Sequence, residues 1–156
     1  MKKPIAIIST DKHLKDENAL ELISLAEQEI SLAKSLGVTR VIWLGDLFDS
    51  RLSQRQELVN CLAEMICMYH EEGLRIDCIP GNHDKTDYTI DESFLSSFKY
   101  HPGFNLYEKP TRIEVSSDLF FDMVPFYAQD VWIKKFEELP PIDGKRVLFS
   151  HISIEG

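Results

Sequence analysis

Aspartate, histidine and asparagine recur in four short clusters along this chain of 156 residues. Carboxylate, imidazole and amide side chains without thiolate suit manganese, iron or zinc in a reactive centre better than a structural zinc site. One carboxylate can bridge two cations, and two cations about 3.5–4 Å apart stabilise both the attacking and the leaving oxygen of a phosphoryl displacement. The clusters therefore predict phosphoester hydrolysis. They are Asp11 with His13, Asp46 with Asp49, Asn82 with His83 and Asp84, and the single residue His151.

Each cluster follows a stretch that has the apolar pattern of a buried strand. Helical spacing of apolar residues fills residues 16–37 and 53–73, and each of these segments ends in glycine. Ser53 and Gln56 are spaced as a capping box for the second helix. Buried strands separated by helices predict parallel βαβ units with right-handed crossovers. The strands that precede the clusters are predicted at residues 4–10, 39–45, 74–81 and 145–151.

Ligand sites in open α/β sheets lie beyond the carboxyl ends of the strands, so the four clusters are predicted to meet at one edge.

The second half of the chain has shorter strand patterns with turn residues between them, at residues 104–110, 111–117 and 118–126. A helical pattern follows at residues 128–139. No repeat or low-complexity linker interrupts the chain, so residues 1–156 are predicted to form one domain.

Taken singly, each cluster also has a structural interpretation. Asp-x-His after a strand is common turn chemistry, Asp49 could cap a helix, and Gly-Asn pairs form turns. A lone His151 at a strand end is more often a hydrogen-bonded structural residue. Their order at successive strand ends favours a shared site over four unrelated turns.

These motifs, in the segments STDKHL, GDLFDS, PGNHD and FSHISIEG, resemble those of the calcineurin-like metallophosphoesterases. The resemblance implies a four-layer αββα sandwich, of which this chain would be an amino-terminal portion with mixed sheets flanked by helices. It also implies two divalent metal ions, with manganese favoured and iron or zinc as alternatives. Asp11 and His13 would bind the first ion, Asp46 would bridge, and Asn82 and His151 would bind the second.

The same resemblance assigns the remaining residues of the motifs. His83 would contact the phosphate and protonate the leaving oxygen as the general acid, and Asp84 would orient His83. Asp49 would steady His13 or the following loop without binding metal itself. Within the superfamily, the GDLFDSR segment and the order of elements are most similar to the nuclease subunits of the SbcCD type, including phage relatives. In these nucleases the strand corresponding to residues 118–125 leads into a loop beside the site.

The chain departs from the family pattern because no closing Gly-His-x-His motif follows His151. Each metal ion would lack one imidazole, so we expect a chain truncated before that motif, with weak or no activity. His70, about 17 residues along a helix from Ser53, is roughly 25 Å from the predicted site and is excluded. His101 is interpreted as a solvated loop residue.

Composition narrows the class of protein further. A formal net charge of −9 leaves no basic surface for nucleic acid, so a polyanionic substrate must be held through metal ions. Three cysteines without paired spacing indicate buried thiols in a reducing compartment. The apolar run near the amino terminus is too short for a signal peptide or a membrane span, which predicts a cytoplasmic protein that does not contact membranes. The aromatic residues are predicted to pack in the core rather than to stack on bases; they are Phe120, Phe121, Phe126, Tyr127 and Trp132.

The predicted function is a two-metal phosphodiesterase, a DNA exonuclease or endonuclease that acts at DNA ends in repair or recombination. The expected partners are DNA and an ABC-type ATPase subunit of the SbcC type, with a homodimer as a further option. The alternative is a metal-dependent phosphatase or phosphodiesterase that acts on a small molecule or a phosphoprotein.

Overall fold

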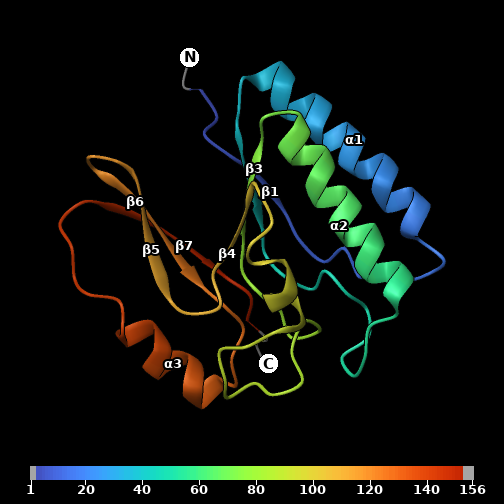
Figure 1. Cartoon of the computed structure of the whole chain (residues 1–156). Helices are drawn as coiled ribbons and strands as arrows, with labels where there is room; N and C mark the ends of the chain where they lie inside the picture. Colours follow the sequence, from blue (N-terminus) through green and yellow to red (C-terminus); the bar gives the residue numbers. More distant parts are fainter. Residues whose placement is uncertain (1–2, 153–156) are drawn as a thin grey trace.

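A computed structural model describes residues 3–152 of the chain (Figure 1). Its first sheet contains four parallel strands whose order in the sheet is their order in the sequence. Right-handed crossovers that always step in the same direction place every connecting helix on the same face of the sheet. The other face is therefore left free for a second layer. The strands are β1 (Ile7–Ser9), β2 (Arg40–Trp43), β3 (Arg75–Cys78) and β4 (Phe104–Leu106).

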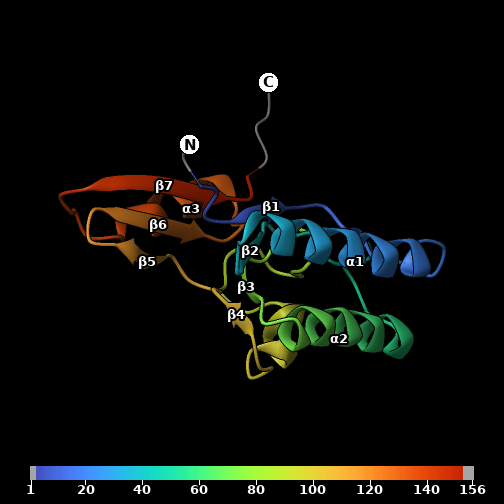
Figure 2. The ribbon, with the colours of Figure 1, turned by 90° about the horizontal axis from the view of Figure 1, so that it is seen from above.

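The connections are α1 (Ala19–Leu36), α2 (Gln56–Glu71) and the short 3₁₀ helix η1 (Phe94–Phe98). Seen from above, α1 and α2 lie together on one side of the first sheet (Figure 2). Gly37 ends α1 with a φ of 66°, the left-handed conformation that glycine adopts at helix ends without strain.

The second sheet is mixed, and it lies on the opposite side of the first sheet from α1 and α2 (Figure 2). It contains β5 (Thr111–Ser116), β6 (Leu119–Val124) and β7 (Lys145–Ser150), in that order. The β5–β6 pair is antiparallel and joined by a turn, whereas β6 and β7 are parallel and joined through α3 (Gln129–Glu137).

Two apolar cores hold these layers together. The larger core lies between the helices and the first sheet and includes Trp43, Met65 and Tyr69. The smaller core lies between the two sheets, where side chains of β2, of β6 and β7 and of the segment after β3 meet. Its buried members are Ile42, Ile79, Phe121, Met123 and Phe149. The predicted α/β class, with mixed sheets flanked by helices, is confirmed.

The predicted capping box of α2 is wrong. The N-cap of α2 is Arg55, which makes no side-chain cap hydrogen bond, and the Gln56 side chain donates to Asn60 one turn further along the helix. Ser53 instead belongs to a turn in which its N–H lies 3.5 Å from the Ser50 hydroxyl oxygen. The side-chain hydroxyl that stabilises the chain before α2 is therefore that of Ser50, not that of Ser53.

The aromatic residues of the segment 118–130 pack as predicted, since Phe121 and Tyr127 are buried in the described structure. After β6 the chain passes the end of β3, where the Phe126 N–H donates to the Pro80 carbonyl. The Phe126 ring lies 5.9 Å from the ring of His151, so this strand does lead into a loop beside the predicted site. Within residues 3–152, no helix has the length and apolar character needed to cross a membrane.

Candidate metal centre

The loop after β1 runs beside the loop after β2 and continues the parallel pairing of those strands. The Asp11 N–H donates to the Gly45 carbonyl (3.2 Å), and the His13 N–H donates to the Asp46 carbonyl (2.9 Å). An isolated parallel bridge between Leu14 and Phe48 closes the paired segment. The side chains of both loops are thereby fixed relative to one another.

Three of the predicted metal ligands have left-handed backbone conformations. The φ angles are 54° at Asp11, 44° at His13 and 52° at Asp46, and these are the non-glycine residues with positive φ among residues 3–152. Such conformations cost on the order of 1–3 kcal/mol each and persist only where the surrounding structure enforces them. Residues in such conformations cluster at functional sites, and all three of these are predicted ligands.

Two glycines allow the loops after β2 and β3 to approach closely. A Cβ atom on Gly45, whose φ is 87°, would lie 2.2 Å from the Gly81 nitrogen. A Cβ atom on Gly81 would lie 2.2 Å from Oδ1 of Asp46. Both positions therefore require glycine for Asp46 to reach its place.

Each of these two loops supplies a carboxylate to the backbone of the other. Oδ1 of Asp46 accepts the His83 N–H at 2.8 Å. In return, Oδ1 of Asp84 accepts the N–H groups of Leu47 (2.9 Å) and Phe48 (3.2 Å). This reciprocal bonding fixes the separation of Asp46 from the Asn82–His83 segment.

Asp84 is fully buried and binds backbone amides with both of its oxygens, because Oδ2 accepts the Gly81 N–H at 2.9 Å. Burial raises the pKa of Asp84 to about 6, although hydrogen bonds from the amides of Gly81, Phe48 and Leu47 act in the opposite direction. The prediction that Asp84 orients His83 needs correction: Asp84 positions the loop that carries His83, and the His83 ring has other partners.

We expect Gly81→Ala to disrupt the site more than the fold. The added methyl group would overlap Asp46, so Asp46 or its loop must shift, whereas neither Gly81 nor Asp46 is a member of either apolar core. Isothermal titration with manganese should show affinity reduced by at least about 10-fold, the scale seen when groups that orient ligands are lost. Gly37→Ala, where no atom lies within 4 Å of the added Cβ, is the control for backbone strain alone. Equal losses of affinity in both variants would contradict the steric explanation.

The second oxygen of Asp46 lies between two imidazoles that come from different sheets. Its Oδ2 is 3.7 Å from Nε2 of His13 and 3.5 Å from Nε2 of His151. Asp46 itself is almost completely buried. One oxygen is therefore held by the backbone, while the other is positioned to bridge.

His151 is held in the orientation that a metal ligand needs. Its Nδ1 lies 2.7 Å from the Leu44 carbonyl oxygen, which can only accept, so Nδ1 carries a proton in this contact. Its Nε2 lies 3.0 Å from Oδ1 of Asn82 and 3.5 Å from Oδ2 of Asp46. Donation of the other ring proton to a carbonyl is typical of metal-ligating histidine.

The spacing of these atoms is close to that of ligands on one ion but slightly wider: Oδ2 of Asp46 lies 3.7 Å from Nε2 of His13 and 3.5 Å from Nε2 of His151. Ligand atoms that are each about 2.0–2.2 Å from one ion lie about 3–3.6 Å apart. Two groups of three side chains each place their ligand atoms within 4.8 Å of one another among the described residues. The first group is Asp11, Asp46 and His151, and the second is His13, Asp49 and His83.

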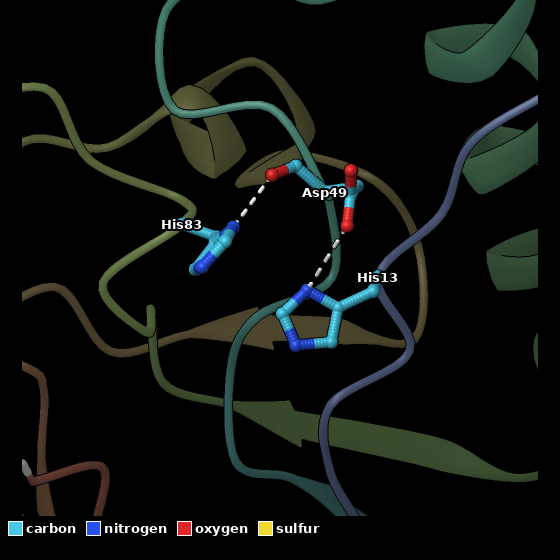
Figure 3. Close-up of side chains that lie close together, drawn as sticks. All are labelled: His13, Asp49 and His83. Atoms are coloured by element: carbon cyan, nitrogen blue, oxygen red, sulfur yellow. Dashed lines mark hydrogen bonds and ion pairs between the residues drawn. The ribbon is translucent and has the colours of Figure 1, made fainter.

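Asp49 lies against the other nitrogen of His13 (Figure 3). Its Oδ1 is 3.6 Å from Nδ1 of His13, a buried atom without a hydrogen-bond partner. Asp49 thus lies where it can orient the His13 ring, as expected from the sequence.

His83 has different surroundings from the proposed ligands. Its Nδ1 contacts the Asp49 carbonyl oxygen at 2.5 Å, and its Nε2 contacts the Arg51 guanidinium at 2.9 Å (Figure 3 shows the carbonyl contact). The ring packs edge to face on His13 with 4.7 Å between centroids. A cation bound at Nε2 would be repelled by the guanidinium, so this face of His83 suits an anion better than a metal ion.

Arg51 was not identified from the sequence. Its NH1 group also lies 3.4 Å from the Tyr88 hydroxyl, so the side chain spans the rim between two loops. The sequence shows an arginine two residues after Asp49, but no spacing rule connects that arginine with His83.

Neither His70 nor His101 belongs to the two groups of candidate ligands. The interpretation of His101 as a solvated residue is wrong, because its Nε2 lies 3.3 Å from Sγ of Cys67 and its ring is partly buried.

Comparison with known proteins gives one relevant similarity. Exonuclease subunit 1 of Enterobacteria phage T4 is 26% identical to this chain over 106 residues, which is 67% of the chain. The match covers 31% of that relative, so the chain corresponds to about a third of its length. The sequence matches no family model.

Proposed function

We propose that this chain is the catalytic core of a two-metal phosphodiesterase of the nuclease type. The observation that supports this most strongly is the position of Asp46, whose free oxygen lies between His13 and His151. Asp11 and His13 would bind one divalent cation. Asn82 and His151 would bind the other, and Asp46 would bridge the two. When bound, the cations supply an activated water nucleophile and neutralise the charge that develops on phosphorus; manganese is the ion we favour.

The chain itself contributes positioning and proton transfer. The Asp46 and Asp84 hydrogen bonds keep the loops rigid, so the ligand atoms need no rearrangement. A phosphate oxygen beside His83 would replace the contact between Arg51 and Nε2, since the guanidinium prefers an anionic oxygen to a neutral ring. Nε2, which accepts from the guanidinium in this contact, would then take up a proton from solvent, and the imidazolium would give that proton to the leaving oxygen.

DNA is the substrate that we propose for this site. The T4 relative is named an exonuclease, and its similarity extends over 67% of this chain. Its name also describes a subunit, which supports a partner subunit for this chain; we propose an ATPase in that role. The net charge of −9 is compatible with this substrate if the cations provide the attraction for phosphate.

The test compares phosphodiesters with phosphomonoesters. With saturating manganese we expect bis(p-nitrophenyl) phosphate to be hydrolysed faster than p-nitrophenyl phosphate, linear DNA to be shortened, and chelation by EDTA to stop each reaction. Faster hydrolysis of the monoester would identify a phosphatase instead. Because weak or no activity is expected without a Gly-His-x-His motif, the same assays are run on a version extended by such a segment. Binding of manganese without turnover in both versions would leave a binding module, and absence of manganese binding would refute the proposed centre.

A further inference from the structure

Between the proposed ligands Asp11 and His13 lies a lysine whose side chain turns into the protein. Lys12 is 6% exposed, although it belongs to a loop at the edge of the sheet. Its Nζ lies 3.1 Å from Oγ of Ser9 and 3.4 Å from Oε1 of Glu29 on α1. A lysine is rarely buried unless it is paired, so this position needs an explanation.

The partners of Lys12 form one connected group. Glu29 accepts the Ser9 hydroxyl at 2.7 Å and, with its other oxygen, the Tyr69 hydroxyl at 2.5 Å. Nζ of Lys12 also lies 4.8 Å from the centre of the Trp43 ring, and Trp43 contacts Tyr69 edge to face. The group thus connects the loop after β1 with both helices and with β2.

Because the Lys12 side chain points into the protein, the backbone of the turn is constrained, and so are the directions of the Asp11 and His13 side chains on either side of it. Since Asp11 and His13 have left-handed backbone conformations, the turn is strained and would relax if its middle residue could leave the core. The Asn18 side chain holds the same turn from outside, because its amide donates to the His13 carbonyl at 2.9 Å. Lys12 anchors the same turn to the protein interior through its contacts with Ser9 and Glu29.

We propose that Lys12, paired with Glu29, is the positioning residue that keeps Asp11 and His13 in metal-binding geometry. Lys12 touches neither the cation nor the substrate and acts through the backbone of the turn. The inference about metal affinity rests on the proposed function, whereas the inference about the turn does not require metal.

The test uses Lys12→Ala with Tyr69→Phe as a matched control. Tyr69→Phe removes one hydrogen bond to Glu29 and leaves the contacts of Lys12 in place. It therefore shows how much the manganese affinity changes when this group of residues is weakened but the turn remains anchored. We expect Lys12→Ala to lower the affinity for manganese by about 10–100-fold in calorimetric titration, and Tyr69→Phe to change it by less than about threefold. All titrations are run well below the melting temperature of each variant.

Amide hydrogen exchange in the metal-free protein provides the second readout. The His13 N–H and the Leu14 N–H, which donate to the carbonyls of Asp46 and Leu47, should lose about 10-fold or more of their protection in Lys12→Ala only. Unchanged protection of these amides would overturn the anchoring role, whatever the metal does. Lost protection with unchanged manganese affinity would overturn the link to the site. A wild-type chain that binds no manganese would refute the proposed function, and the exchange result would still decide the role of Lys12.

Discussion

Asp46→Asn is expected to abolish manganese binding at both positions while the protein remains folded. Asparagine keeps an oxygen that can accept the His83 N–H, and it tolerates the left-handed conformation of residue 46 better than most residues do. The bridging oxygen becomes an amide nitrogen, which is not a metal ligand. Because one atom serves both ions, we expect the stoichiometry to fall from two ions per chain to none at concentrations that saturate the wild type, as measured by plasma emission after dialysis.

Asp118→Asn serves as the control for this measurement. Asp118 is exposed and pairs with Lys145 at 3.2 Å in the second sheet, away from the proposed ligands. Its substitution removes the same charge and should leave the stoichiometry unchanged. If the Asp46 variant retained one ion with unchanged affinity, Asp46 would belong to one position only. Two retained ions would remove it from the centre altogether.

His83→Ala is expected to separate metal binding from catalysis. His83 is not a proposed ligand, so manganese stoichiometry should not change, but loss of a general acid typically lowers turnover by about 10²–10⁴-fold. The size of the loss should depend on the leaving group. The alkoxide released from DNA needs a proton, whereas p-nitrophenolate departs without one. We therefore expect a large loss of rate with DNA and a loss of at most about 10-fold with bis(p-nitrophenyl) phosphate.

The control is His70→Ala, because His70 is an exposed histidine on α2 outside both groups of ligand atoms. It should leave the rates with both substrates as they are. Equal losses for DNA and for the aryl diester in His83→Ala would indicate that His83 binds the phosphate without transferring a proton. An unchanged DNA rate would exclude His83 from the reaction.

The sequence alone predicted the parts of this molecule that depend on local pattern. Apolar runs located the strands of the first sheet to within a few residues, because strands covered on both faces have few polar positions. The rule that parallel strands of one sheet end at a common edge correctly brought Asp11 and Asp46 together. It does not explain His151, which also lies beside them but follows β7 of the second sheet and not a strand of the first. The roles of these residues as metal ligands remain predictions.

The parts that could not be predicted depend on side-chain direction between distant segments. Lys12 and Glu29 are 17 residues apart, and nothing in their spacing indicates that one turns inward to meet the other. The family resemblance assigned Asp84 to orient His83, yet the oxygens of Asp84 accept backbone amides of its own loop and of the loop after β2. Asn18 was absorbed into the helical pattern, although its side chain returns to the loop after β1.

The two sheets contribute unequally to the proposed centre, and this difference affects the order in which they unfold. His151 follows β7 in the second sheet, whereas the other proposed ligands follow strands of the first. The buried core between the sheets contains five residues, far fewer than the core beneath the helices. A cation shared by Asp46 and His151 would therefore cross-link two layers that share the smaller of the two cores. At a concentration 100 times its dissociation constant, a ligand that binds only the assembled form stabilises it by about 2.7 kcal/mol. Chelation should then release the second sheet before the first, and a bound ion would in that case maintain tertiary structure in addition to its proposed chemistry.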